Sequence, residues 1–329
     1  MRSELVALFA DEFALCGLTS DESVAVLTAG GPRDEYADAF ITAAGEHGAE
    51  AFRVDLPPPA FRRGERSVSN NPLERSPATV EALKQCDLLV DLAYLLWTKE
   101  QHEIQDSGTR ILTCIASVDV LVRLFPSQEQ KQRVLEAASF LKEARELRVT
   151  NDAGTDVTYE LGQYSVLAQY GFTDEPGRWD NFPSALVAAA GNDGSVHGQV
   201  ALQPGDILFP FDRYASDPVS FTIENGFVTD IKGGADALLI REHLRSFDDE
   251  RAYAISHIGW GMNGDAKWTA LATGSKWDAR AVLGSVLFST GPNLELGGTN
   301  DTRCHLDFPM RGCSLELDGR RIIDHGEML

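Results

Sequence analysis

The 329-residue sequence contains no continuous run of about 20 apolar residues, the length that a membrane-spanning helix requires. Its first dozen residues carry acidic side chains and include no apolar segment followed by a small-residue cleavage site. A secretion signal is therefore also missing from the pattern. We expect a cytoplasmic protein.

Positive charge is scarce as well. Lys and Arg number 29 against 50 Asp and Glu, which gives a formal net charge of −21. A surface this acidic repels phosphate backbones and anionic lipids, so nucleic acid and membranes are excluded as expected partners. We interpret the charge as an adaptation for solubility or salt, with an acidic docking surface as the alternative.

The cysteines are few and lack spacing typical of a shared site. The chain has five, an odd number, and no pair forms a Cys-x-x-Cys motif. This pattern argues against a disulfide framework and against a cysteine zinc site. We expect reduced and mostly buried thiols.

Strand and helix patterns alternate over the first 150 residues. The expected strands cover residues 23–27, 51–56, 88–92 and 110–115. The last two are continuous apolar runs without alternation, as in strands that are buried on both faces of a parallel sheet. Amphipathic or capped segments between and after them predict helices over residues 34–46, 77–86 and 128–146. We predict a layered α/β domain with a mostly parallel sheet over residues 1–150.

The pattern changes after residue 150. Short strand signals are separated by turn residues, and Asn225-Gly226 predicts a type I′ hairpin between residues 221–224 and 227–231. One helix is expected over residues 235–247. We predict an α+β domain with an antiparallel sheet over residues 151–329, and the residues that point to a catalytic metal site, described next, lie in this domain.

The residues that most clearly indicate a metal-binding site lie toward the C-terminus. His305 and Asp307 are two residues apart, which on a strand places an imidazole and a carboxylate on one face. His257 follows an expected strand and precedes glycines that allow the backbone to approach a ligand closely. Two imidazoles and one carboxylate suit ferrous iron or a similar divalent metal. The structural alternative is that His305 simply donates a hydrogen bond to Asp307.

These segments, taken together, make the chain similar to a known family. Thr109-Arg110-Ile111-Leu112, Ser256-His257-Ile258-Gly259-Trp260-Gly261 and Cys304-His305-Leu306-Asp307 resemble segments of the 2,5-dihydroxypyridine 5,6-dioxygenase family. That family is itself similar to the thermophilic metallo-aminopeptidases. The resemblance spans nearly the whole chain and implies a single non-haem Fe(II). It also implies that His257, His305, Asp307 and Ser289 are the metal ligands; by its sequence alone, Ser289 is equally a loop hydroxyl or a helix cap.

The sequence departs from the family at three positions where the resemblance implies pocket residues. Trp97 stands where the family has a His, Gln169 where it has a Glu, and Asn181 where it has a His. Neither amide can titrate near neutral pH, so the proton-handling groups are altered although the metal ligands are kept. Trp97 is expected to stack on a flat ring, and Gln169 and Asn181 to hydrogen-bond to it. Structural roles for all three are the alternative.

The predicted function is Fe(II)-dependent, extradiol-type cleavage of a hydroxylated aromatic N-heterocycle such as 2,5-dihydroxypyridine, by an oxidoreductase of aromatic catabolism. The predicted partners are this substrate, dioxygen and further copies of the chain in a homo-oligomer. An aminopeptidase-like hydrolase is the main alternative. It needs two metals, and Glu295, Asp301 and Glu316 are the nearby acids that could serve it. A binding protein without catalysis is the third interpretation.

Overall fold

The computed structural model describes residues 2–31, 33–58, 71–273 and 277–329. Within them the chain forms two compact units. The first unit comprises Met1–Lys131 and Gln169–Ser184, and the second comprises Gln132–Ala168 and Ala185–Leu329. The predicted domain boundary at residue 150 falls at the end of a strand of the second unit, and the division into domains at that residue stays a prediction.

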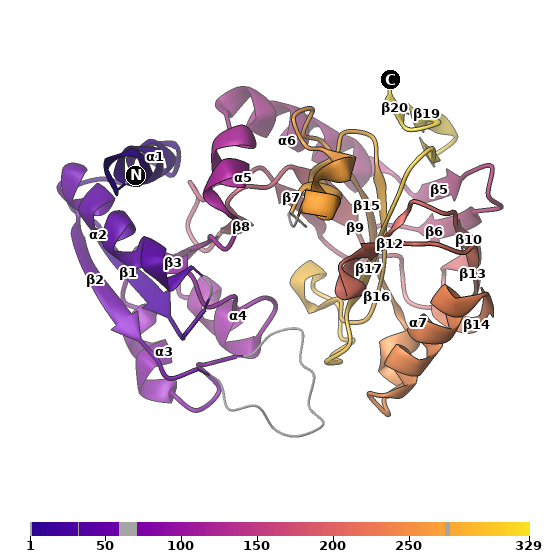
Figure 1. Cartoon of the computed structure of the whole chain (residues 1–329), viewed down its shortest axis with the longest axis horizontal. Coiled ribbons are helices and arrows are strands. Elements are labelled where there is room, and N and C mark those ends of the chain that lie inside the picture. Colours follow the sequence, from indigo (N-terminus) through magenta and orange to yellow (C-terminus); the bar gives the residue numbers. More distant parts are fainter. Residues whose placement is uncertain (1, 32, 59–70, 274–276) are drawn as a thin grey trace. The chain divides into compact units, whose positions relative to one another are not determined.

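The first unit is built on a parallel sheet with the strand order β2-β1-β3-β4-β8, of which Figure 1 labels β1, β2, β3 and β8. Its strands are β1 (Ser23–Thr28), β2 (Glu50–Asp55), β3 (Leu88–Asp91), β4 (Arg110–Thr113) and β8 (Trp179–Asn181). Its helices are α1 (Arg2–Leu15), α2 (Ala37–Glu46), α3 (Pro77–Leu83), α4 (Lys99–Asp106) and α5 (Val118–Arg123), with the 3-10 helix η1 (Asp34–Tyr36).

Apolar packing explains why this sheet forms. Every residue of β3 and β4 is buried, as their unbroken apolar runs predict. Helix α1 packs on α2, where the Phe9 and Phe40 rings stack with centroids 3.7 Å apart. The strand β8 reaches this sheet only after the chain has begun the second unit, and it pairs in parallel with β4.

The second unit contains two larger antiparallel sheets and the small sheet β11-β12. The first has the strand order β14-β13-β10-β6-β5-β18-β19-β20, and the second has the order β17-β16-β15-β9-β7. The strands are β5 (Glu146–Thr150), β6 (Asp156–Glu160), β7 (Val166–Gln169), β9 (Leu186–Ala189), β10 (His197–Leu202), β11 (Ile207–Leu208), β12 (Arg213–Tyr214), β13 (Val219–Glu224), β14 (Phe227–Gly233), β15 (Ile255–Gly261), β16 (Val286–Thr290), β17 (Leu306–Met310), β18 (Ser314–Leu317), β19 (Arg320–Asp324) and β20 (Glu327–Met328). The helices are α6 (Gln128–Glu143), which begins in the first unit, α7 (Ala235–Arg245) and α8 (Asp278–Ala281), with the 3-10 helices η2 (Phe209–Phe211), η3 (Glu250–Tyr253), η4 (Trp268–Thr273) and η5 (Leu294–Leu296).

An aromatic cluster holds the two antiparallel sheets together. Phe221 of β13 contacts Phe288 of β16 and Phe308 of β17, with ring centroids 5.5 and 5.2 Å away. One face of β16 and β17 is therefore apolar core, and alternation directs their remaining side chains to the opposite face. The predicted α/β class with a mostly parallel sheet, followed by an α+β class with an antiparallel sheet, is confirmed.

Several local predictions can be compared with the structure. The hairpin forms between β13 and β14, and Asn225 and Gly226 both have positive φ, as a type I′ turn requires. All five cysteines are buried and free of disulfides, as expected. No helix in the described part of the chain is both long and apolar enough to cross a membrane.

Candidate metal centre

Three neighbouring strands, β15, β16 and β17, carry the candidate ligands in adjacent positions. Ser289 of β16 lies directly opposite Asp307 of β17 in the strand register. His257 is on β15, which pairs with β16 on its other edge through a register shift between Ile255 and Ile258. His305 directly precedes β17, two residues before Asp307. Residues in facing positions of antiparallel strands share one side of the sheet, so these side chains gather on one face.

The apolar face opposite the candidate ligands fixes the register of their strands. Leu306 and Phe308 alternate with the candidate ligands along β17, and both are fully buried. A shift of one residue would exchange this apolar set with the polar set, so burial of the aromatic cluster fixes the register of the site. Gly259 contributes on β15, because a Cβ there would overlap the carbonyl oxygen of Val187 on β9. The glycine permits the close approach of β9 to β15, whereas its place in the sequence suggested a close approach of the backbone to a ligand.

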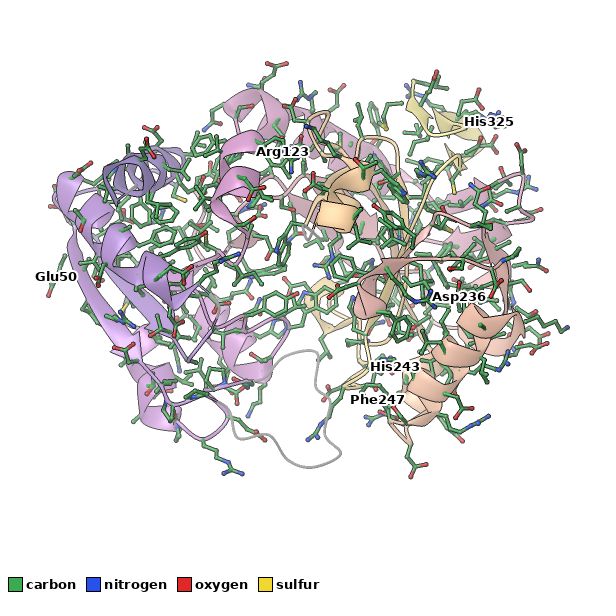
Figure 2. All side chains as sticks on the ribbon, viewed as in Figure 1. Glu50, Arg123, Asp236, His243, Phe247 and His325 are labelled. Carbon is green, nitrogen blue, oxygen red and sulfur yellow. The ribbon has the colours of Figure 1, made fainter. Side chains whose placement is uncertain are left out.

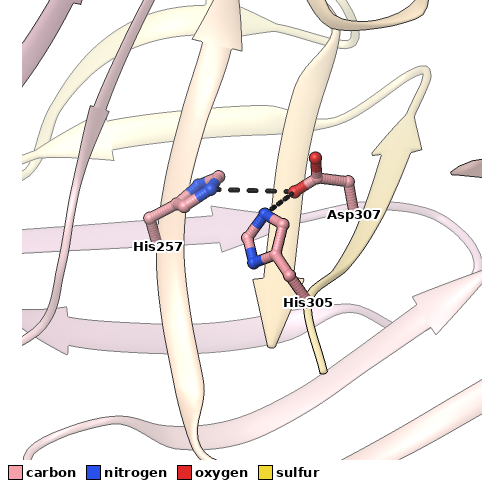
Figure 3. Close-up of side chains that lie close together, drawn as sticks. All are labelled: His257, His305 and Asp307. Carbon is pink, nitrogen blue, oxygen red and sulfur yellow. Dashed lines mark ion pairs between the residues drawn. The ribbon is translucent and has the colours of Figure 1, made fainter. Parts of the chain in front are cut away.

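The side chains of His257, His305 and Asp307 converge (Figure 3). One potential ligand atom from each lies within 4.8 Å of the others. The Oδ1 atom of Asp307 is 3.1 Å from Nε2 of His305 and 3.7 Å from Nε2 of His257. The imidazole centroids are 5.4 Å apart, and all three residues are buried. Among the described residues, this is the group of acids, histidines and cysteines whose geometry suits a metal ion.

Ser289 lies beside this group. Its hydroxyl donates a hydrogen bond to Oδ1 of Asp307 over 2.5 Å, and the residue is fully buried. The same oxygen faces both imidazoles, so Ser289 contacts the carboxylate oxygen that is nearest the two histidines. A helix cap is excluded as its role, because Ser289 is within β16.

Burial and charge set the protonation of the site. Burial lowers the pKa of His257 to about 3, so its imidazole is neutral and keeps a lone pair for a metal at physiological pH. Burial alone would raise the pKa of Asp307, but His305, Arg280 and His257 together outweigh it and hold that pKa well below its usual range. The site therefore presents a carboxylate beside neutral nitrogen, the charge state that binds a divalent cation.

Arg280 is the residue at this site that the sequence did not reveal. Its guanidinium lies 2.8 Å from Oδ2 of Asp307, and its side chain is 13% exposed. The short helix α8 carries it, 27 positions before Asp307 in the sequence. Because the contact links elements far apart in sequence, and Arg280 has no motif of its own, no local pattern indicated it.

The three predicted pocket residues belong to the first unit. Trp97 follows β3 and has a φ of 55°, a left-handed conformation that is unusual for a bulky side chain. Gln169 and Asn181 are buried, and Ser184 donates a hydrogen bond to Oε1 of Gln169 over 3.4 Å. The Nε2 atom of Gln169 and the Oδ1 atom of Asn181 are buried without a hydrogen-bond partner in the described part of the chain. Such atoms are rare in a protein interior and are expected where a ligand completes the bonding.

The other histidines take no part in the triad. The polar sequence around these five histidines predicts solvent-facing side chains. This prediction is confirmed for His197 and His325, which are exposed, and Figure 2 labels His325 near the C-terminus. It is wrong for His47, His102 and His243, which are partly buried. His47 has a ring nitrogen 2.9 Å from the carbonyl oxygen of Ala10, so it contributes to helix packing.

The observed donors fit a single transition metal. Two imidazole nitrogens and one carboxylate oxygen, all buried and on one face, leave other coordination positions available. The fold and the site together define a class of protein. It has an α/β unit and a second unit of antiparallel sheets, and the second unit carries a group of two histidines and one carboxylate.

Comparison with known proteins places the chain within a family. A family model described as NicX, 2,5-dihydroxypyridine 5,6-dioxygenase, matches residues 4–329, and the chain belongs to this family. A 2,5-dihydroxypyridine 5,6-dioxygenase of Pseudomonas putida KT2440 is 38% identical over 337 residues, covering 99% of this chain and 96% of the relative. The solved structure of 2,5-dihydroxypyridine dioxygenase from Pseudomonas putida KT2440 has a TM-score of 0.96 at 38% identity, covering 100% of this chain and 98% of that one.

A more distant structural likeness concerns the fold alone. Wild-type AmpT from Thermus thermophilus has a TM-score of 0.63 at 14% identity, and each chain is covered completely. The similarity between the dioxygenase family and the aminopeptidases that the sequence suggested is thus present at the level of the fold.

Proposed function

We propose that this chain is a mononuclear Fe(II) dioxygenase that opens the ring of 2,5-dihydroxypyridine, or of a close relative, between C5 and C6. The observation that carries the proposal is the convergence of His257, His305 and Asp307 in a chain that belongs to this family along nearly its whole length. The 38% identical relative bears the name of this activity.

The donor set supports iron as the metal. Two histidines and one carboxylate on a single face are typical of non-haem Fe(II) oxygenases, which keep open positions for substrate and oxygen. When bound, the iron would orient the two reactants and lower the barrier for electron transfer between them. His257, His305 and Asp307 would hold it, and Ser289 is proposed as an additional ligand because its hydroxyl contacts Asp307.

The chain's own residues contribute burial and charge. The neutral imidazole of His257 and the carboxylate of Asp307 stay in their metal-binding states without a proton change near neutral pH. Burial of all three residues excludes bulk water and strengthens electrostatic interactions with a bound metal. The reaction adds both atoms of one O₂ molecule across the broken C5–C6 bond, which turns 2,5-dihydroxypyridine into N-formylmaleamate with no other reactant.

We propose Trp97, Gln169 and Asn181 as the residues that contact the ring. The unpartnered Nε2 of Gln169 and Oδ1 of Asn181 offer one donor and one acceptor, in the described structure, to a ligand that carries hydroxyl and ring nitrogen groups. The left-handed backbone at Trp97 supports a functional position, because strained conformations cluster at binding sites.

The hydrolase alternative has less support. A two-metal hydrolase needs a second set of ligands about 3.5–4 Å from the first metal. Among the described residues, the group that suits a metal contains none of Glu295, Asp301 and Glu316. The likeness to AmpT, at 14% identity, concerns the fold and gives no support to a shared reaction.

Oxygen uptake tests the proposed function. The protein is loaded anaerobically with Fe(II) and offered a panel of hydroxypyridines and hydroquinones. We expect uptake with 2,5-dihydroxypyridine or a related hydroxypyridine, and one iron per chain by elemental analysis. Two tightly bound zinc ions together with peptide hydrolysis would transfer the assignment to the hydrolase. We also still predict that the enzyme is cytoplasmic and forms a homo-oligomer. Light scattering would test the oligomeric state.

A further inference from the structure

The two oxygens of Asp307 have different neighbours. Oδ1 accepts the hydrogen bond of Ser289 and faces Nε2 of both His305 and His257. Oδ2 is 2.8 Å from the guanidinium of Arg280. One oxygen is thus directed toward the candidate metal position, and the other is held by a cation on a different element.

Arg280 is itself held in place. Its guanidinium carbon lies 4.4 Å from the centroid of the Phe209 ring and 5.7 Å from that of Trp277, within cation–π range. The helix α8 that carries it is tied to β15 and its following loop, where the amide of Asn263 donates to the carbonyl of Ala281 over 2.7 Å. The position of the arginine is therefore fixed by contacts outside the candidate metal ligands.

This arrangement restricts how Asp307 can bind a metal. A free carboxylate can rotate and offer both oxygens, which would fill an extra coordination position. A guanidinium that bonds Oδ2 fixes the carboxylate plane and keeps that oxygen engaged. Groups that orient a ligand in this way typically change metal affinity or activity by about 10–100-fold when they are removed.

We propose that Arg280 is a positioning residue that holds Oδ2 of Asp307, so that the metal is bound through Oδ1 alone and a coordination position stays open for a reactant. This inference rests on the proposed metal site. It concerns the mode of binding and does not depend on which substrate is cleaved.

Cobalt(II) binding to the full-length, metal-free protein tests the proposal. Cobalt(II) is a visible-absorption probe whose band intensity falls as its coordination number rises. We compare the natural protein with Arg280→Met and Arg280→Lys. We expect Arg280→Met to bind cobalt(II) about 10–100-fold more weakly, with weaker visible bands as Asp307 becomes free to use both oxygens. Arg280→Lys keeps the charge but not the fixed planar geometry, so it should lie between the two.

The controls separate this role from stability and from simple charge. Phe209→Leu removes the ring beneath the guanidinium and should give a smaller change of the same sign. Arg311→Lys is the matched control, because Arg311 also lies over an aromatic ring, Trp268, and should leave cobalt(II) binding unchanged. Circular dichroism of each metal-free variant checks folding; should Arg280→Met not fold, Arg280→Lys and Phe209→Leu carry the test.

Each outcome decides between the interpretations. If Arg280 acted only as a positive charge near the metal, its removal would strengthen cobalt(II) binding, and that result would overturn the proposal. Unchanged affinity, or weaker binding with an unchanged spectrum, would overturn it too. If the natural protein itself bound no stoichiometric cobalt(II) or iron, the metal site would be wrong and the proposed function would fail with it.

Discussion

At the scale of single residues, burial decides which groups can act as ligands. His257 is kept neutral by its surroundings, and Asp307 is kept ionised by its charged neighbours. The sequence could indicate His305 and Asp307 because His-x-Asp spacing on a strand places both side chains on one face. It could indicate His257 because this residue follows an expected strand and precedes glycines. It could not identify Arg280, whose contact with Asp307 depends on the tertiary placement of α8.

Removal of a candidate ligand should abolish iron retention. We expect His305→Ala to lose Fe(II) almost completely. Removing a group that only supports a ligand typically lowers metal affinity by about 10–100-fold, and removing the ligand itself should lower the affinity further. Ser289→Ala should cost less, within that range, because Ser289 adds a neutral oxygen. Iron content after desalting is the measurement, with the exposed His325→Ala as the control. Equal iron in His305→Ala and the natural protein would eliminate the site.

Glu295 gives the stability of the protein a pH dependence. Burial raises its pKa from 4.5 to about 8, and its Oε2 atom is buried. A carboxyl whose pKa is raised in the folded state stabilises the protein fully below its unfolded pKa, and this contribution is lost as the pH rises toward the folded pKa. Glu295→Gln stays neutral throughout. Its melting temperature relative to the natural protein should therefore rise between about pH 4.5 and 8 and then level off.

Thermal unfolding across this pH range provides the check for Glu295. Glu136→Gln, at an exposed position of α6, is the control for the chemical change itself. If the melting temperature of Glu295→Gln minus that of the natural protein does not change with pH, or falls as the pH rises, the carboxyl is ionised in the folded protein.

At the scale of elements, local patterns predicted the strands that bury both faces and the hairpin with its turn. They failed where a distant contact decides a boundary. The helix expected over residues 128–146 ends at Glu143, because the carboxylate of Asp318 accepts hydrogen bonds from the backbone amides of Arg145 and Glu146. The strand β8 was also beyond local prediction, since its three residues become a strand only by pairing with β4.

Close packing of β15 against β9 should affect the candidate metal site, because β15 carries His257. A methyl group at Gly259 would overlap the carbonyl oxygen of Val187 and lie 2.7 Å from Cβ of Ala188. Gly259→Ala should thus push the strands apart, destabilise the protein by about 1–3 kcal/mol and weaken iron retention, because His257 is two residues away. Denaturant unfolding and iron content measure the two effects.

A matched glycine distinguishes crowding from the substitution itself. A methyl group at Gly264 would meet no heavy atom within 4 Å, so Gly264→Ala should be close to neutral. If Gly259→Ala were as stable and as iron-rich as Gly264→Ala, the close packing of β15 against β9 would not be what places His257.

At the scale of the whole molecule, the family relationship covers both units, whereas the candidate ligands lie in one of them. The sequence predicted the two fold classes from the change from continuous apolar runs to short strand signals that are separated by turn residues. It could not predict that Gln169–Ser184 returns to the first unit, because that return is a matter of topology and leaves no local signal.

The departures at Trp97, Gln169 and Asn181 predict altered substrate use. Replacing titratable groups by amides and an indole removes proton acceptors, and loss of one general base typically costs about 10²–10⁴ in rate. We expect slow turnover of 2,5-dihydroxypyridine and better turnover of a ring that is already ionised or carries another hydroxyl. The variant Trp97→His, Gln169→Glu, Asn181→His should be faster on 2,5-dihydroxypyridine. Equal rates would show that these positions are structural.

The central claim is that iron held by His257, His305 and Asp307 directs both atoms of dioxygen into one ring. The most direct measurement is mass spectrometry of the product after the Fe(II)-loaded protein has turned over a hydroxypyridine under isotopically labelled O₂. The account predicts a ring-opened product with both labelled atoms, absent when Asp307→Asn replaces the natural protein. A ring-opened product that lacks one or both labelled oxygen atoms, or one formed equally well by Asp307→Asn, would contradict it.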